Sequence, residues 1–145
     1  MKKTISLILC LVLIVSALSI SAFAADPEEN YLEPIIPEYT RVTMIAAGLT
    51  ISSDGEALCS GTVEPTYSTD TVTLIVRLQY WSGTEWVNYC TWETTDSGHY
   101  YVQLIETETV PAGYSYRVRI SAHCAPASGT PSETVYANSY VKSYP

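Results

Sequence analysis

The chain has 145 residues, of which 47% are hydrophobic and 15% are charged, and its formal net charge is −8. All 15 acidic residues lie after residue 24, against five basic residues, so that part of the chain carries a net charge of −10. Such an excess of negative charge repels phosphate backbones and anionic lipid headgroups. We therefore expect the protein to bind neither nucleic acids nor membrane surfaces.

The first 24 residues have the pattern of a secretory signal peptide. Lys2 and Lys3 supply the positive start, an apolar run follows from Ile5 to Ile20, and residues 22–24 form an A-x-A cleavage site. We therefore expect the mature chain to begin at Ala25 and to be secreted into the extracellular space. Since no second apolar segment follows, no membrane attachment is expected after the signal is removed.

Residues 25–40 contain five acidic residues and three prolines, without a period of 2 or 3.6. This composition predicts an acidic, Pro-rich, extended leader rather than a folded element. Two interpretations remain open, namely a solvated tether and a docking peptide built around Tyr31-Leu32 and Ile35-Ile36. The remainder, residues 41–145, has the length of one compact domain.

From residue 41 the chain is rich in Thr, Val, Tyr, Ile and Ser, and apolar residues alternate with polar ones, which is typical of half-buried strands. Turn signals separate these stretches, among them Ser53-Asp54-Gly55-Glu56 and Asp96-Ser97-Gly98. In chain order we expect strands around Leu49–Ile51, over Ala57–Val63, Thr71–Trp81, Trp86–Thr94, Tyr100–Thr107 and Tyr114–Cys124, and a final strand over Ser132–Ser143.

The alternation also predicts which side of each strand faces the core. Leu74, Val76, Leu78 and Tyr80 share one side of the third strand, while the even-numbered residues from 114 to 124 share one side of the sixth. No apolar stripe of period 3.6 is long enough for a core helix. About seven short strands with no helix between them predict an all-β fold, an antiparallel β-sandwich.

The segment Gly-Tyr-Ser-Tyr-Arg at 113–117 is close to the G-x-S-x-G elbow of serine hydrolases. That elbow requires glycine on both flanks, because its strained turn leaves no room for side chains. Arg117 occupies the second flank, and no helix is expected after it. We therefore expect Ser115 to be a surface residue at the start of a strand and not a nucleophile.

Other catalytic and metal sites are not expected either. His99 and His123 belong to no zinc-ligand spacing, and no D-x-D-x-D run for calcium is present. Glu106 and Glu108 lie two residues apart on one face of a strand, which is typical of a charged edge rather than of a glycosidase pair. We expect no enzyme activity, no metal and no cofactor.

One cluster of aromatic residues remains as a candidate contact site. Five aromatic residues crowd into residues 80–92, and the candidate ligand contacts among them are Trp81, Trp86, Tyr89 and Trp92. Alternation sends about half of any strand inward, so part of this set is expected in the core. The outward remainder would form a protein contact or a platform for sugar rings, the latter on Trp86 and Trp92.

The segment Val-Pro-Ala-Gly-Tyr-Ser-Tyr-Arg-Val-Arg-Ile-Ser-Ala, residues 110–122, resembles the corner and sixth strand of fibronectin type III domains. In that family a Pro-Gly corner precedes a tyrosine whose hydroxyl bonds back to the backbone. The resemblance implies an immunoglobulin/fibronectin type III-like sandwich, with Tyr116 as the corner tyrosine.

From about residue 41 the chain also resembles a family of short secreted proteins of Gram-positive bacteria that is classed as a domain of unknown function. The shared features are Ala-x-Cys-x-Gly-x-Val at 57–63, Leu-Gln at 78–79, the residues Trp86, Tyr89 and Trp92 at a spacing of three, and Gly-x-x-Tyr-Arg-Val at 113–118. The resemblance implies secretion and a sandwich fold, and it carries no function.

Cys59 and Cys124 are each in phase with the apolar residues of their strands, the second and the sixth. In the sandwich that the resemblance implies, these strands face each other across the core. A disulfide between Cys59 and Cys124 is therefore expected, with Cys90 left as a thiol. The pairs Cys59–Cys90 and Cys90–Cys124, and three free thiols, remain as alternatives.

These observations favour a secreted, non-enzymatic binding or interaction module whose partner is an extracellular protein or a glycan. The alternative is a carbohydrate-binding module that uses the aromatic hairpin around Trp86 and Trp92. Binding to polysaccharides distinguishes the two hypotheses.

Overall fold

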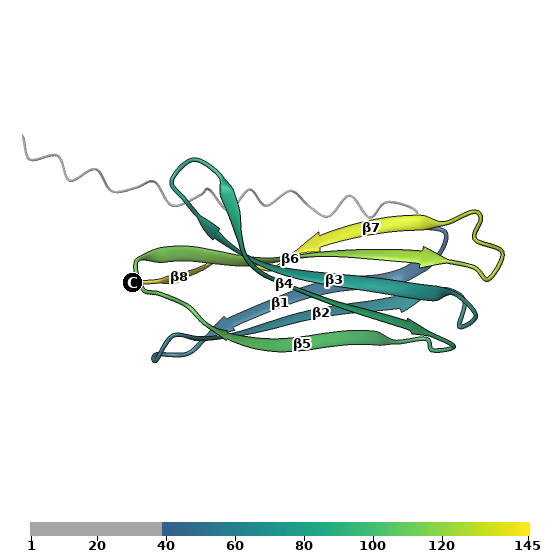
Figure 1. Cartoon of the computed structure of the whole chain (residues 1–145), viewed down its shortest axis with the longest axis horizontal. Coiled ribbons are helices and arrows are strands. Elements are labelled where there is room, and N and C mark those ends of the chain that lie inside the picture. The colour runs from purple at the N-terminus through teal and green to yellow at the C-terminus, as the bar shows by residue number, and fades with distance from the viewer. Residues whose placement is uncertain (1–38) are drawn as a thin grey trace, which may run out of the picture.

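The computed structural model describes residues 39–145, so the predicted signal peptide and most of the predicted leader lie outside the described residues. The described chain forms two antiparallel sheets stacked as two layers (Figure 1). The first sheet has the order β1-β2-β5, and the second has the order β4-β3-β6-β7 with β8 also paired to β6. The strands are β1 (Val42–Ile51), β2 (Glu56–Pro65), β3 (Thr71–Trp81), β4 (Trp86–Ser97), β5 (Val102–Thr109), β6 (Tyr114–Ala125), β7 (Glu133–Asn138) and β8 (Lys142–Tyr144).

The inner faces of the two sheets follow the predicted alternation. On β3 every second residue from Val72 to Leu78 is fully buried, and on β6 every second residue from Tyr116 to Cys124 is buried. Buried residues of β1, β2, β5 and β7 complete the same core. The predicted all-β, antiparallel sandwich of about seven strands is therefore confirmed. Because strand side chains alternate between faces, each sheet keeps a second face toward solvent.

The two sheets approach each other closely at Gly61 of β2. A β-carbon on Gly61 would lie 2.7 Å from Cγ2 of Val76 and 3.1 Å from Cγ2 of Ile120, both on the facing sheet. Val76 and Ile120 are cross-strand partners on β3 and β6, so together they fill the space that the missing side chain leaves. Gly61 fixes the alignment of β2 against the facing sheet, because protein cores are close-packed and a larger residue would collide there.

The final strand differs from the prediction of one continuous strand over residues 132–143. It is divided into β7, which ends at Asn138, and β8, which begins at Lys142. Between them the Ser139 hydroxyl accepts a hydrogen bond from the Val118 amide at 2.8 Å and donates one to the Tyr140 carbonyl at 2.9 Å. The side chain replaces a backbone acceptor, which interrupts the ladder between β6 and its neighbour.

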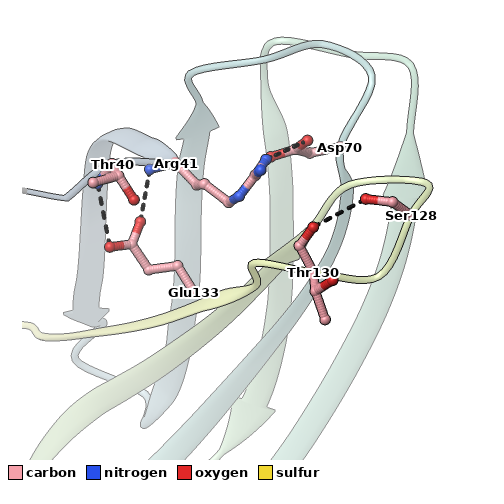
Figure 2. Close-up of polar contacts among 6 residues, drawn as sticks. All are labelled: Thr40, Arg41, Asp70, Ser128, Thr130 and Glu133. Atoms are coloured by element: carbon pink, nitrogen blue, oxygen red, sulfur yellow. Dashed lines mark hydrogen bonds and ion pairs between the residues drawn. The ribbon is translucent and has the colours of Figure 1, made fainter.

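At one end of the sandwich, polar side chains tie the start of β1 to the second sheet (Figure 2). The Arg41 guanidinium donates to both carboxylate oxygens of Asp70, at 2.9 and 2.8 Å, and Asp70 is only 1% exposed. The Glu133 carboxylate, at the start of β7, accepts hydrogen bonds from the Thr40 and Arg41 amides at 3.2 and 2.8 Å. These contacts satisfy charges that would otherwise be costly to bury.

The same end includes residues assigned to the predicted leader. Tyr39 packs against the core, and Thr40 takes part in the contact with Glu133. Beside them the Ser128 hydroxyl donates to the Thr130 carbonyl at 3.0 Å within the β6–β7 loop (Figure 2). The folded domain therefore includes two residues that precede the expected boundary at residue 41.

At the other end, Tyr116 forms the predicted corner contact. Its hydroxyl donates a hydrogen bond to the Pro111 carbonyl at 2.6 Å, and the residue is 1% exposed. Burial raises the pKa of Tyr116 to about 12, and the neighbouring tyrosines add to this shift. The predicted bond from the tyrosine hydroxyl back to the backbone is confirmed.

Replacing Tyr116 with phenylalanine removes this hydrogen bond and leaves the ring in place. We expect Tyr116→Phe to lower the free energy of unfolding by about 1 kcal/mol, the usual net contribution of one hydrogen bond, in urea unfolding near neutral pH. Tyr140→Phe, at an exposed position, is the control and should leave stability unchanged. The Tyr116 hydroxyl ionises near pH 10 in the unfolded chain but has a pKa of about 12 in the folded domain. Raising the pH above about 10 therefore favours the unfolded chain and lowers the free energy of unfolding. The Tyr116→Phe variant should not show this part of the decrease.

The close contact at Gly61 gives a second prediction. Gly61→Ala should destabilise the domain by about 1–3 kcal/mol, because the added methyl group must push the facing side chains apart. In a double-mutant cycle measured by thermal unfolding, Val76→Ala should compensate for part of this loss by opening space. Gly98→Ala is the control, since a β-carbon there meets no atom within 4 Å and the change reports only the cost of its positive φ. Strict additivity of the two alanine substitutions would argue against the close approach.

Candidate functional site

The outer face of the five-stranded sheet gathers arginine and aromatic side chains. The strand register places Arg77 opposite Arg119 on β3 and β6, and Trp81 opposite Trp86 on β3 and β4. These residues alternate with the buried residues of their strands, so they point away from the core. We call this surface the arginine–aromatic face and define it by Arg77, Trp81, Trp86, Arg117, Arg119 and Tyr136.

A stack of side chains at one end of this face joins β3, β4 and β6. The ring centroids of Trp81 and Trp86 lie 5.4 Å apart, with an angle of 57° between the ring planes. The guanidinium carbon of Arg117 lies 4.3 Å from the Trp86 ring centroid, within the range of a cation–π interaction. The tip of the β3–β4 hairpin, which both tryptophans flank, projects beyond the two layers (Figure 1). The stack therefore lies at a margin of the domain where a partner has access.

A chain of amide side chains orients Arg117. Its Nε donates to Oε1 of Gln79 at 2.9 Å, and Nε2 of Gln79 donates to Oδ1 of Asn88 at 2.8 Å. Partial burial lowers the pKa of Arg117, and the charge of the neighbouring Arg119 adds to this shift. Within residues 39–145 the terminal nitrogens of Arg117 donate no hydrogen bond, so they remain available to a ligand.

Arg77 and Arg119 lie directly opposite each other on neighbouring strands. Arg77 donates to Oγ of Ser121 at 3.1 Å, and the guanidinium carbon of Arg119 lies 5.6 Å from the Tyr136 ring centroid. Among the described residues, no carboxylate lies within 4.0 Å of Arg77, Arg117 or Arg119. Like charges that face each other across a strand pair are destabilising. The three arginines form a positive patch that the described domain leaves without direct neutralisation.

The neighbourhood of this patch is poor in acidic residues. Among the described strand positions that point to this side, Glu93 is the one acidic residue, and it lies opposite Ile75. Residues 39–145 contain ten acidic and five basic residues, and three of those five basic residues are on this face. The charge of the face is therefore opposite in sign to the charge of the whole chain.

The predicted aromatic contact residues do not all share one surface. Trp86 lies on the arginine–aromatic face together with Trp81, whereas Trp92 lies opposite Val76 and packs against the core. A β-bulge between the two positions leaves Tyr89 as an extra residue of β4. One extra residue reverses the alternation, so the two tryptophans point to opposite sides of the sheet. The expectation that Trp86 and Trp92 form one platform is therefore corrected.

Tyr89 joins the two sheets along one open side of the sandwich. Its hydroxyl donates a hydrogen bond to the Thr109 carbonyl of β5 at 3.2 Å. The side chain thus reaches from the edge strand β4 of the second sheet to the edge strand β5 of the first. Tyr89 is 40% exposed, but its contact is structural and it lies apart from the arginine–aromatic face.

The three cysteines of the described chain are free thiols, so the expected Cys59–Cys124 disulfide is not present there. Gly61 packs against Ile120, and β2 and β6 run in the same direction (Figure 1). Cys59 precedes Gly61 by two residues and Cys124 follows Ile120 by four, which separates the two cysteines by roughly 20 Å along the strands. Bridged cysteines need Cα atoms within about 7 Å. The strands β2 and β6 do face each other, but Cys59 and Cys124 lie at different positions along the strand direction.

The environments of the thiols make them weak nucleophiles. Burial raises the pKa of Cys59 to about 12 and the pKa of Cys124 to about 11. The Cys90 thiol donates to Oε2 of Glu108 at 3.5 Å, and burial together with that carboxylate raises the pKa of Cys90 as well. Because the thiolate is the reactive form and the usual metal ligand, these cysteines are not activated for chemistry near neutral pH.

The residues considered above as catalytic hold contacts within the fold. The hydroxyl oxygens of Ser115 and Ser143 lie 3.0 Å apart. Nδ1 of His99 lies 3.1 Å from a carboxylate oxygen of Asp96, and Nδ1 of His123 forms a 2.9 Å contact with a threonine hydroxyl of β7. In the part of the chain that the structure describes, no group of three His, Cys, Asp or Glu side chains is placed to hold a metal ion.

No helix within residues 39–145 is long and apolar enough to cross a membrane. Comparison of the chain with models of protein families and with curated proteins gave no match.

Sequence analysis alone did not single out the arginines. The available signal was the Arg-x-Arg sequence at 117–119, together with Arg77 in the outward phase of its own strand. Alternation gives the side of the sheet to which each residue points, but the register between β3 and β6 is needed to bring Arg77 opposite Arg119.

The thiol environments give a prediction for the reactivity of the three cysteines. Iodoacetamide at about pH 8 should modify Cys59, Cys90 and Cys124 in denaturant and should leave Cys59 and Cys124 unmodified in the native protein. The reason is that both are fully buried and have raised pKa values. Mass mapping of peptides under non-reducing conditions provides the measurement. A bridged peptide containing any two of the three cysteines would contradict the free-thiol arrangement.

Proposed function

We propose that the protein is a secreted, non-enzymatic binding module that contacts an extracellular partner through the arginine–aromatic face. The observation that supports this proposal is the patch of arginines without carboxylate partners, next to the stacked rings of Trp81 and Trp86. Tryptophan, tyrosine and arginine are the residues that contribute most to binding energy at interfaces, since each offers a large contact area or a rigid set of donors.

A binding role also suits the shape and rigidity of this surface. Arg117 is held by Gln79 and by the Trp86 ring, so a partner pays little entropy to order it. A sheet face presents its side chains at fixed spacings, whereas catalysis usually needs a concave site that excludes water. Binding of a partner to a flat, preorganised face is therefore the favoured function.

Carbohydrate binding is the second candidate function, and the half-buried tryptophan stack on the outer face favours it. With Trp92 partly buried against the core, the sugar-contacting rings would be Trp81 and Trp86 rather than the pair expected from the sequence. Sugar rings stack on aromatic faces because both surfaces are flat and partly apolar. A protein partner would use the same face in a different way, with the arginines as anchors in pockets of the partner.

The test is retention of the secreted protein on immobilised polysaccharides and on the surface of the cells that secrete it. Trp86→Ala and Arg117→Ala should each reduce retention by about tenfold, the effect of losing roughly 1.4 kcal/mol of binding energy. Leu58→Ala provides a matched control, because Leu58 is an exposed apolar residue on the three-stranded sheet. Retention lost in the Leu58 variant and kept in the Trp86 variant would assign binding to the opposite face.

The stability of the Trp92→Ala variant, compared with that of Trp86→Ala, tests which of the two tryptophans supports the core. Because Trp92 packs against the core, its removal should lower the free energy of unfolding by roughly 3 kcal/mol. Trp86→Ala should retain most of the stability, as judged by thermal unfolding. If Trp86→Ala instead unfolds the domain, the Trp81–Trp86 stack is structural and the proposal loses its main support.

A further inference from the structure

We infer that the ligand of the arginine–aromatic face is an acidic polysaccharide, a chain of sugar residues that carry carboxylate groups. This inference rests on the proposed function and deepens it, because it names the chemical class that the face selects. It follows from three features of the face: its unneutralised charge, the spacing of its arginines, and the neutral donors and rings between and beside them.

The first feature is the charge. Arg77 and Arg119 face each other across β3 and β6, and Arg117 lies two residues from Arg119 along the same strand face. Partial burial lowers the pKa of Arg117, and repulsion from the neighbouring Arg119 cation lowers it further. An anionic ligand removes this repulsion when it binds. The face therefore gains more from an anion than from a neutral ligand of the same shape.

The second feature is the spacing. Neighbouring strands lie about 4.8 Å apart, and every second residue along a strand is displaced by roughly 6.6 Å. The Cα atoms of the three arginines therefore form a small triangle with sides of several ångströms. A polymer with one carboxylate on each successive sugar residue can meet more than one guanidinium at once. Each guanidinium can hold a carboxylate through two parallel hydrogen bonds.

The third feature is the set of neutral groups around the charges. Asn138 lies opposite Arg119, Thr91 lies opposite Arg77, and the amides of Gln79 and Asn88 lie in the next row. The side chains of Asn138, Thr91 and Asn88 are exposed and can hydrogen-bond sugar hydroxyls. The Gln79 amide is buried and holds Arg117 and Asn88 in place. The Trp81–Trp86 stack lies beyond the amide row, where it can contact a sugar ring. The groups that can bind carboxylates, sugar hydroxyls and a sugar ring thus follow one another in that order along the face.

These features favour a polysaccharide over an acidic peptide. A peptide carries its carboxylates on flexible side chains, and ordering each of these costs entropy. An extended peptide also gains most from pairing its backbone with a sheet edge, whereas the arginines lie on the inner strands β3 and β6 of the sheet. Sugar rings and their hydroxyls match the tryptophans and amides that accompany the arginines here.

The net negative charge of the chain does not oppose this inference. Charges are screened beyond about 8 Å at physiological ionic strength, so a ligand in contact with the face responds mainly to the groups within it. Glu56 and Glu64 belong to β2 of the other sheet, and Asp70 is neutralised by Arg41 at one end of the sandwich. Among the described strand positions on this side, Glu93 is the one acidic residue, so the three arginines leave the face with a net positive charge.

The experiment compares polygalacturonate with its fully methyl-esterified form, which has the same backbone and no charge. The secreted protein should bind polygalacturonate at physiological ionic strength in calorimetry or affinity electrophoresis, and methyl esterification should weaken binding at least about tenfold. Arg119→Gln should weaken binding of the acidic polymer by about tenfold, the effect of losing one charge-assisted contact. Arg119→Lys should keep part of the affinity because the charge remains.

Lys142→Gln is the matched control, because it removes one positive charge outside the arginine–aromatic face. Lys142 is exposed on β8 opposite Tyr116, a position in the phase of the core-facing side. It should bind polygalacturonate like the wild type. Equal weakening by Arg119→Gln and Lys142→Gln would mean that only net charge matters and would overturn the inference. Equal binding of the acidic and esterified polymers would overturn it too.

Poly-L-glutamate tests the competing class of partner. Binding of poly-L-glutamate as tight as that of polygalacturonate, with the same loss in Arg119→Gln, would assign the face to acidic peptides and would overturn the polysaccharide inference. The proposed function fails differently. If Trp86→Ala abolishes retention on cells while Arg119→Gln does not, the face binds a partner and only its assignment to an acidic ligand is wrong.

Discussion

The packing of Gly61 against Val76 and Ile120 is the constraint on which the arrangement of the two sheets depends. It sets the level of β2 against β3 and β6, and the levels of all other inward residues follow from the strand registers. One result is that Cys59 and Cys124 both enter the core without meeting. Another is that the second sheet carries its three arginines on its outer side, because the inward phase of β3 and β6 is occupied by apolar residues.

The distribution of charge in this domain is more informative than its total. Glu133 and Asp70 are used at one end to tie β1 to the second sheet, and Glu108 lies against a thiol at the side between β4 and β5. These carboxylates form contacts within the folded domain. The arginines of β3 and β6 are held by neutral amides, a hydroxyl and aromatic rings instead, which orient a guanidinium without cancelling its charge.

The sequence predicts the core of this fold well because period-2 alternation is unbroken on β3 and β6. The bounds of β3 at Thr71 and Trp81 agree with the prediction. Alternation fails in β4, where the single extra residue Tyr89 reverses the phase and leaves no mark in the composition. The split between β7 and β8 depends on the hydroxyl of one serine, which local sequence does not distinguish from any other strand serine. The candidate site depends on the register between strands, and a single sequence does not contain that relation.

The two ends of the described chain lie at opposite ends of the sandwich, since β1 starts beside Asp70 and β8 is paired with the start of β6 (Figure 1). A pull on these two ends is therefore directed along the strands. The hydrogen bonds of an antiparallel ladder lie perpendicular to that direction, so tension loads many of them at once in shear instead of opening them one by one. If the leader is attached to one surface and the arginine–aromatic face binds another, the domain resists a force that pulls the two surfaces apart.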